Sequence, residues 1–125
     1  METVNCPFCN PHAKDILHRN DLCYARWDIF PVSAGHILVI PFRHMTDYFS
    51  MTNDERHAVV DLIMECKDLL EKTHHSDGYN IGFNVGTTAV QTVRHSYCHV
   101  IPRYTGDVPD AQGGIRGVVP GRRRG

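Results

Sequence analysis

The amphipathic segment in the middle of the chain restricts the fold more than any other feature. Thr52 and Glu55 have the spacing of a capping box, in which two side chains satisfy free backbone amides at the start of a helix. Apolar residues then recur at steps of three and four, which predicts one apolar stripe: Val59, Leu62, Ile63, Cys66, Leu69 and Leu70. Gly78 fits the helix stop or the turn just beyond it. A stripe of this kind needs a partner to cover it, and a sheet is the available one.

Two strand-like runs precede this helix and two follow it. Residues 22–30 and 36–41 are rich in apolar and aromatic side chains and are separated by a turn with proline and glycine. Residues 79–86 alternate large apolar residues with asparagine and glycine, and residues 94–103 form the last run, which we expect Pro102 to close. This order predicts an α+β fold, an antiparallel sheet with one main helix.

The length of 125 residues suits one domain, which we place at residues 1–104. Residues 105–125 are dense in glycine, proline and charge, so we expect an irregular or partly disordered C-terminal tail. The balance of 13 basic and 14 acidic residues gives no general attraction to nucleic acid or to membranes. We interpret the arginine run at 122–124 as a solvated chain end.

The cysteine count and the N-terminus favour a cytoplasmic protein. No signal peptide pattern opens the chain, and no apolar stretch approaches the length of a membrane span. Five cysteines, an odd number, are more typical of a reducing compartment, where thiols bind metal or stay free.

Cys6 and Cys9 form a CxxC motif, whose turn can aim both sulfurs at one tetrahedral ion. His44, just past the second strand, and His95, at the start of the fourth, are candidates for the other two ligands. A redox dithiol and plain free cysteines are the competing interpretations of the motif.

Two further histidines offer alternative ligands. His12 and His18 lie close to the CxxC motif in sequence, although ordinary solvated histidines are the better interpretation of both.

His95, Tyr97 and His99 occupy alternate positions, so in a strand they point to one face. Just upstream, uncharged hydrogen-bonding side chains gather in a short stretch: Asn84, Thr87, Thr88, Gln91 and Thr92. Together with backbone amides, such groups can hold phosphate oxygens. A solvent-facing side of a strand is the competing interpretation of the histidine pair.

The segment NVGTTAVQTVRHSYCHVIPRY (84–104) resembles the signature of the histidine triad (HIT) family. That signature is roughly Asn-x-Gly-x-x-Ala-Gly-Gln-Thr-Val-x-His-x-His-x-His followed by two apolar residues. The CPFC motif, the segment DIFPVSAGHILVIPFRH (28–44) and the capped helix follow the family's order, so the resemblance covers residues 6–104. The tail motif GGIRGVVP (113–120) is similar to that of a bacterial-type branch.

The resemblance implies a small α+β protein, usually a homodimer, that binds a purine nucleotide of the AMP type. Family members cleave the bond between the α-phosphate and its leaving group in dinucleoside polyphosphates or nucleoside phosphoramidates. The middle histidine of the triad attacks phosphorus, and water hydrolyses the resulting nucleotidyl-enzyme.

The resemblance also implies roles for individual residues. Asp28 matches the position that hydrogen-bonds the ribose hydroxyls, and Ile29 lies beside the base. Phosphate-contacting positions are matched by Asn84, Gln91, Thr92 and His99. Catalytic positions are matched by His36, His95, Tyr97 and His99. The ligands of one structural zinc ion per chain are matched by Cys6, Cys9, His44 and His95.

Two residues depart from the family pattern. Tyr97 stands at the nucleophile's position, and a phenol with a pKa of about 10 is largely protonated where imidazole is already nucleophilic. Tyr97 therefore predicts weak turnover, a trapped adduct or no catalysis. Val90 stands where the family has glycine. If φ is positive there, a β-branched residue costs about 1–2 kcal/mol and reshapes the loop that carries Gln91.

Three functions therefore compete. The first is a family-type enzyme that hydrolyses or transfers a nucleoside monophosphate, which we favour because the rest of the site looks intact. The second is a nucleotide-binding relative that has lost catalysis at Tyr97. The third is a zinc-stabilised interaction module that no longer uses nucleotides.

Overall fold

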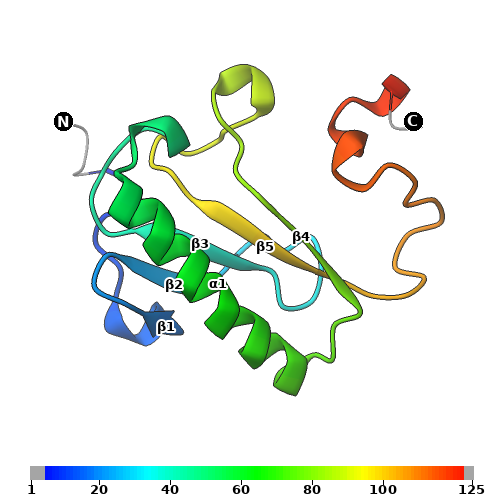
Figure 1. Cartoon of the computed structure of the whole chain (residues 1–125), viewed down its shortest axis with the longest axis horizontal. Helices are drawn as coiled ribbons and strands as arrows, with labels where there is room; N and C mark the ends of the chain where they lie inside the picture. Colours follow the sequence, from blue (N-terminus) through cyan, green and yellow to red (C-terminus); the bar gives the residue numbers. More distant parts are fainter. Residues whose placement is uncertain (1–4, 123–125) are drawn as a thin grey trace.

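The computed structural model describes residues 5–122 and shows a single sheet with one long helix packed on it (Figure 1). In chain order the elements are β1 (His18–Arg19), β2 (Cys23–Trp27), β3 (Ile37–Pro41), α1 (Asn53–Thr73), β4 (Gly78–Gly82) and β5 (Cys98–Arg103). The strand order is β1-β2-β3-β5-β4, and every neighbouring pair is antiparallel. The predicted α+β fold is therefore confirmed, and β5 lies between β3 and β4.

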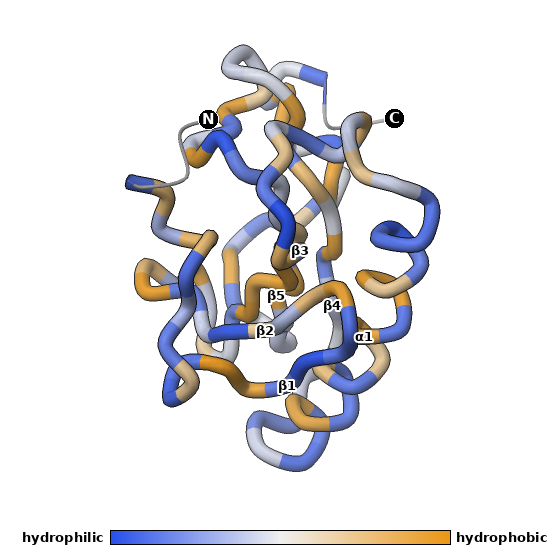
Figure 2. Tube along the Cα trace, turned by 90° about the vertical axis from the view of Figure 1, so that its left-hand side faces the viewer, coloured by the Kyte–Doolittle hydropathy of each residue, from blue (hydrophilic) through white to orange (hydrophobic). Residues whose placement is uncertain are grey.

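The capping box forms as the sequence predicted. The Thr52 hydroxyl accepts from the Glu55 amide, and the Glu55 carboxylate accepts from the Thr52 amide. The apolar stripe faces the sheet: Val59, Leu62, Cys66 and Leu70 are buried, while Ile63 and Leu69 are partly buried. Figure 2 shows the resulting alternation of apolar and polar residues along α1. The helix ends at Thr73, before Gly78, which opens β4 instead.

The far face of the sheet carries a second, smaller core. Tyr24, Leu38 and Ile40 pack there with Phe8 and Tyr97. The Tyr24 hydroxyl donates to the Phe8 carbonyl at 2.6 Å, which ties the N-terminal segment to the sheet. Both faces of the sheet are therefore covered, and the CxxC motif is held close to the strands.

The last strand is shorter than predicted. β5 begins at Cys98 rather than at residue 94, because the Ser96 amide donates to the Met45 carbonyl, in the loop after β3, at 3.0 Å. His95 and Tyr97 consequently precede the ladder instead of belonging to it. Pro102 does not close the strand either; it lies within β5, opposite Tyr79 of β4.

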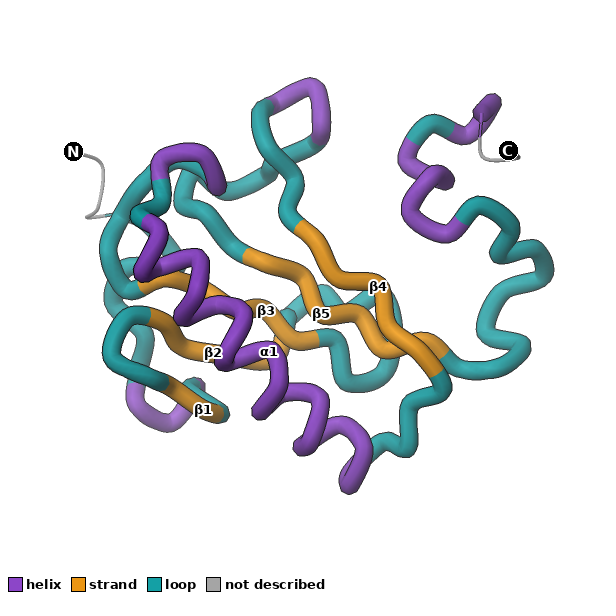
Figure 3. The backbone as a smooth tube through the Cα atoms, in the orientation of Figure 1, coloured by secondary structure: helices purple, strands orange, loops and turns teal. Residues whose placement is uncertain are grey.

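Strand β1 was not predicted, since two residues are too few to show an alternating pattern. The tail is irregular, as expected, apart from two short 3₁₀ turns at Gly114–Val118 and Pro120–Arg122 (Figure 3). Most of the arginine run at 122–124 lies outside the described residues. Within residues 5–122, no helix combines the length and the apolar character needed to cross a membrane.

Candidate functional site

The four predicted metal ligands converge at one end of the sheet. Cys6 and Cys9 come from the N-terminal segment, His44 from the loop after β3, and His95 from the loop before β5. Their ligand atoms all lie within 4.8 Å of one another. The alternative ligands behave differently: His18 pairs with Glu65 of α1 at 3.6 Å, and neither it nor His12 belongs to the cluster.

The distances within the cluster suit a tetrahedral ion. The Sγ of Cys9 lies 3.2 Å from Nδ1 of His44, and the Sγ of Cys6 lies 3.4 Å from Nδ1 of His95. The two Nδ1 atoms are 3.1 Å apart. Tetrahedral zinc with ordinary bond lengths requires S···N separations of about 3.6 Å and N···N separations of about 3.3 Å. Two sulfurs and two imidazole nitrogens in this arrangement therefore fit zinc after shifts of a few tenths of an ångström.

The surroundings of His95 orient it for such a role. Its Nε2–H donates to the Pro41 carbonyl at 2.8 Å, which leaves the Nδ1 lone pair facing the sulfurs. Burial lowers the pKa of His95 and favours the neutral imidazole that a metal needs. Burial and the neighbouring Cys6 raise the pKa of Cys9 to about 11, so a bound cation would have to displace a proton from the thiol.

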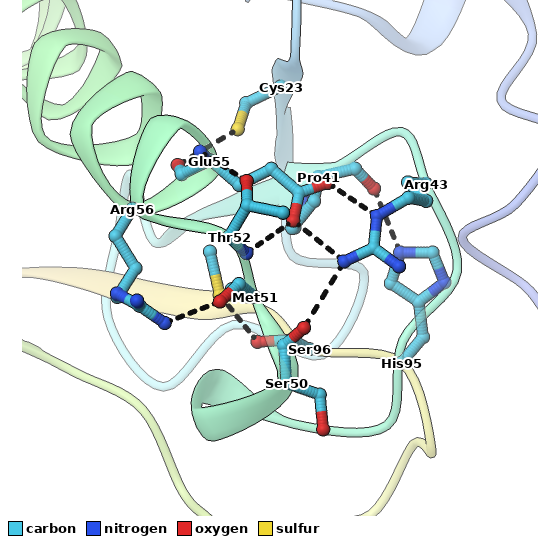
Figure 4. A network of polar contacts seen from close by, with 10 residues as sticks. All are labelled: Cys23, Pro41, Arg43, Ser50, Met51, Thr52, Glu55, Arg56, His95 and Ser96. Carbon is cyan, nitrogen blue, oxygen red and sulfur yellow. Dashed lines mark hydrogen bonds and ion pairs between the residues drawn. The ribbon is translucent and has the colours of Figure 1, made fainter.

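An ion pair joins this cluster to the start of the helix (Figure 4). Arg43 directly precedes His44, and its Nε and Nη2 each donate to a different oxygen of Glu55 at 2.9 Å. The same guanidinium donates to the Ser50 carbonyl at 3.2 Å. This pairing with Arg43 lowers the pKa of Glu55. Glu55 therefore caps α1 and at the same time fixes the loop that carries a metal ligand.

A second cluster joins Asp28, His36 and His99 on the far side of the sheet from α1. The Val32 amide donates to Nδ1 of His36 at 3.1 Å, so the proton of the neutral ring is on Nε2. That Nε2–H donates to Nδ1 of His99 at 3.0 Å and lies 3.4 Å from the Asp28 carboxylate. Burial lowers the pKa of both His36 and His99, which keeps the two rings neutral.

This chain of hydrogen bonds fixes what each ring offers a ligand. Because Nδ1 of His99 accepts from His36, the His99 proton is on Nε2, and this atom is a donor. The ligand atoms of Asp28, His36 and His99 also lie within 4.8 Å of one another, as in a metal site. His36, however, has no free lone pair while Val32 occupies Nδ1, so we interpret the group as a hydrogen-bonding site. Ile29 is exposed next to Asp28, where a base was predicted to lie.

The predicted phosphate loop contains both braced and free side chains. The Gln91 carboxamide accepts from the Gly86 amide at 3.0 Å and donates to the Val93 carbonyl at 2.9 Å, so in this conformation it braces the loop. Asn84 makes no side-chain hydrogen bond to any residue between 5 and 122. Contacts of these side chains with phosphate stay predictions. Val90 has φ 64° and ψ 42°, so the condition for backbone strain at this position is met.

Tyr97 is buried, and its ring packs edge-on against Phe8 and His99, each with ring centroids 5.1 Å away. Its hydroxyl lies 2.9 Å from Oγ1 of Thr92, its sole hydrogen-bond partner in the described part of the chain. His95, Tyr97 and His99 therefore divide between separate environments: a metal cluster, an aromatic core and a polar site. Within residues 5–122, the hydroxyl forms no hydrogen bond to an imidazole or a carboxylate that could act as a base.

The sequence analysis did not find several hydrogen-bond partners of the candidate site residues. The Val32 amide and the Pro41 carbonyl belong to the backbone, so no residue type announces them. The capping box singled out Glu55, but nothing in the sequence indicated Arg43 as its partner.

Comparison with known proteins gives consistent matches. The profile of the HIT domain matches residues 11–106. An uncharacterized HIT-like protein from Saccharolobus solfataricus is 32% identical over 109 residues, which is 84% of this chain and 78% of that protein. AP-4-A phosphorylase from Mycobacterium tuberculosis is 28% identical over 93 residues, 74% of this chain; these span only 48% of the phosphorylase. The crystal structure of a Zn-bound histidine triad family protein from Mycobacterium smegmatis superposes with a TM-score of 0.75 at 29% identity, covering 86% of both chains.

Proposed function

Since this chain belongs to the HIT domain family, we propose that it binds nucleoside monophosphates and dinucleoside polyphosphates without efficient turnover. The supporting observation is the environment of Tyr97, which stands at the position of the family's nucleophilic histidine. The Tyr97 hydroxyl forms its hydrogen bond with Thr92 rather than with a base. Because of this observation we prefer the hypothesis of nucleotide binding without efficient turnover to the hypothesis of a family-type hydrolase, which we favoured from the sequence.

The polar cluster of Asp28, His36 and His99 supports the first part of the proposal, which is nucleotide binding. The Asp28 carboxylate can accept from two ribose hydroxyls, and Ile29 offers an apolar surface for the base. The Nε2–H of His99 is a donor for a phosphate oxygen, and the Asn84 carboxamide has no hydrogen bond to residues 5–122. The name of the Mycobacterium tuberculosis relative supports a dinucleoside tetraphosphate among the ligands, although this chain spans about half of that protein's length.

The environment of Tyr97 supports the second part of the proposal, which is the lack of efficient turnover. Attack on phosphorus by a phenol needs a base that accepts its proton, and the Tyr97 hydroxyl is hydrogen-bonded to the Thr92 hydroxyl rather than to an imidazole or a carboxylate. Replacement by histidine restores a group that is nucleophilic without deprotonation.

We also propose one structural zinc ion at Cys6, Cys9, His44 and His95. When bound, zinc would supply rigid cross-linking of the N-terminal segment to the loops around the sheet. The Zn-bound relative supports this assignment. We propose a cytoplasmic location, because five cysteines, an odd number, suit a compartment that keeps thiols reduced.

A homodimer is the expected assembly. β4 is an edge strand, and the apolar side chains of Ile81 on this strand and of Val60 and Met64 on α1 are exposed. A second copy of the chain that covers this face would bury them and extend the sheet.

Calorimetry with AMP tests the proposed binding. The wild-type chain should bind AMP, and Asp28→Ala should weaken binding about tenfold because the ribose loses a charged hydrogen-bond partner. Asp68→Ala, which removes an exposed carboxylate of α1, is the matched control and should bind as the wild type does. Equal affinity of all three proteins, or no heat of binding for the wild type, would reject the proposal.

A further inference from the structure

The face of the sheet that points away from α1 carries an arginine beside the polar cluster. Side chains alternate along β2, so that Ala25 packs in the core under α1 and the ring of Trp27 contacts His74 at the end of α1. Arg26 and Asp28 therefore both point to the opposite face of the sheet. Two residues of a strand separate them, which is about 7 Å.

The strand register places this arginine close to the rest of the polar cluster. Arg26 of β2 pairs with Leu38 of β3, and Leu38 pairs in turn with His99 of β5. The Asp28 amide donates to the His36 carbonyl at 2.9 Å, so these two residues form the adjoining row of the sheet. Leu38 is only 5% exposed and forms an apolar floor between the arginine and the histidine. Arg26 therefore borders the patch that we propose to hold the ribose and the phosphate.

The guanidinium of Arg26 keeps donors for a ligand. Arg26 is partly buried and forms no ion pair with any residue between 5 and 122. Burial raises the pKa of Tyr24, and the nearby charge of Arg26 opposes this rise, which places the guanidinium near the Tyr24 hydroxyl. That hydroxyl donates its own proton to the Phe8 carbonyl and carries no charge, so it does not neutralise the arginine. A guanidinium has several N–H donors in a planar fork, more than one hydroxyl oxygen can accept.

The position proposed for the ribose brings the base close to Arg26. A phosphate at His99 and ribose hydroxyls at Asp28 orient the nucleoside from β5 toward β2. The base is attached to the ribose carbon next to these hydroxyls, so it also lies near the end of β2. Ile29 follows Asp28 in the chain and offers an exposed apolar surface there, whereas Arg26 offers hydrogen-bond donors.

We propose that Arg26 binds the edge of the base and that the site therefore prefers guanine to adenine. The proposal rests on the proposed nucleotide-binding function. Guanine has two acceptors, O6 and N7, on one edge, and they match two donors of a guanidinium. Adenine has N7 next to the N6 amino group, which is itself a donor, so only one donor of Arg26 is satisfied. The family resemblance implies a ligand of the AMP type, so the proposal assigns a different base to this chain.

Calorimetry with AMP, GMP and IMP tests this preference. The wild-type chain should bind GMP about tenfold more tightly than AMP, because a well-placed pair of hydrogen bonds discriminates between bases by at least this factor. IMP should also bind about tenfold more tightly than AMP, since it has O6 and N7 but lacks the 2-amino group of guanine. This comparison needs no variant. Affinity for IMP equal to that for AMP would overturn the assigned contact, because the 2-amino group would then explain a preference for GMP.

Variants of Arg26 measure its share through the ratio of GMP affinity to AMP affinity, in which a general effect of charge cancels. Arg26→Ala should lower this ratio from about ten to about one. Arg26→Gln should lower it to one or below, because a carboxamide has both the donor and the acceptor that suit adenine. Arg19→Ala is the matched control: Arg19 is an exposed arginine of β1 that pairs with Tyr24, so it lies on the same face but farther from Asp28. Its ratio should equal that of the wild type, and thermal melting verifies the fold of each variant.

The outcomes separate this inference from the proposed function. AMP binding with a wild-type ratio of one or below overturns the role of Arg26 and upholds nucleotide binding. A ratio that stays near ten in Arg26→Ala or Arg26→Gln, or that falls as far in Arg19→Ala, also overturns this role. No binding of AMP by the wild type rejects the proposed function and with it the inference.

Discussion

Replacement of Val90 by glycine should stabilise the protein, although it removes an apolar side chain. Val90 has φ 64°, a left-handed conformation that costs a residue other than glycine about 1–2 kcal/mol. Its side chain is 65% exposed, so little apolar burial is lost with it. Glycine adds conformational freedom to the unfolded chain, which costs about 0.4–1 kcal/mol. The net expectation is a gain of about 1 kcal/mol, or about 4 °C in Tm for a chain of this size.

Urea unfolding and thermal melting of the wild type, Val90→Gly and Val90→Ala measure this gain. Alanine keeps the strain from Cβ but removes the β-branch, so its stability should lie between those of the other two proteins. A lower Tm for Val90→Gly than for the wild type, with unchanged cooperativity, would refute the strain at this position.

Two further perturbations test the metal cluster and the ion pair beside it. Cys9→Ser should release zinc and lower the Tm, as measured by metal analysis and melting; an unchanged metal content would remove Cys9 from the ligand set. Glu55→Gln should cost about 1 kcal/mol at pH 7, because it removes the charge of a buried carboxylate that accepts two hydrogen bonds from the half-exposed Arg43. The pKa of Glu55 in the folded protein lies below its ordinary value of 4.5. The ionised Glu55 therefore makes its full contribution to the free energy of unfolding above pH 4.5, and this contribution is lost as the pH falls through the folded pKa. Below about pH 4, the free energies of unfolding of the wild type and of Glu55→Gln, measured with urea, should converge. A difference between these two free energies that stays constant down to about pH 2 would contradict the lowered pKa of Glu55.

The parts of the fold that local chemistry determines were predictable from sequence. The capping box of Thr52 and Glu55 located the helix start, and the apolar period located its buried face. The helix end was less predictable, because His75 rather than a glycine adopts the positive φ, at 54°. The start of β5 depended on the loop after β3, whose Met45 carbonyl accepts from the Ser96 amide, and that contact is not contained in the sequence of β5 itself.

The candidate site divides in the same way. Residue types and spacing made Cys6, Cys9, His44 and His95 candidates, and the family resemblance implied them as one ligand set, but only the fold shows their ligand atoms within 4.8 Å of one another. The sequence also showed tyrosine at the nucleophile's position. It did not show that Thr92 pairs with the Tyr97 hydroxyl, or that the Val32 amide sets the proton on His36, because both contacts depend on tertiary structure.

The most direct test of binding without efficient turnover is intact-protein mass spectrometry combined with an assay of AMP release. The wild type and Tyr97→His are incubated with diadenosine tetraphosphate and with a nucleoside phosphoramidate, at ligand concentrations that calorimetry shows to be saturating. The wild type should gain no nucleotidyl mass and release no AMP above background, whereas Tyr97→His should release AMP at least about a hundredfold faster, since the variant carries an imidazole at the nucleophile's position. A nucleotidyl adduct on wild-type Tyr97, or AMP release by the wild type at the rate of the variant, would contradict it.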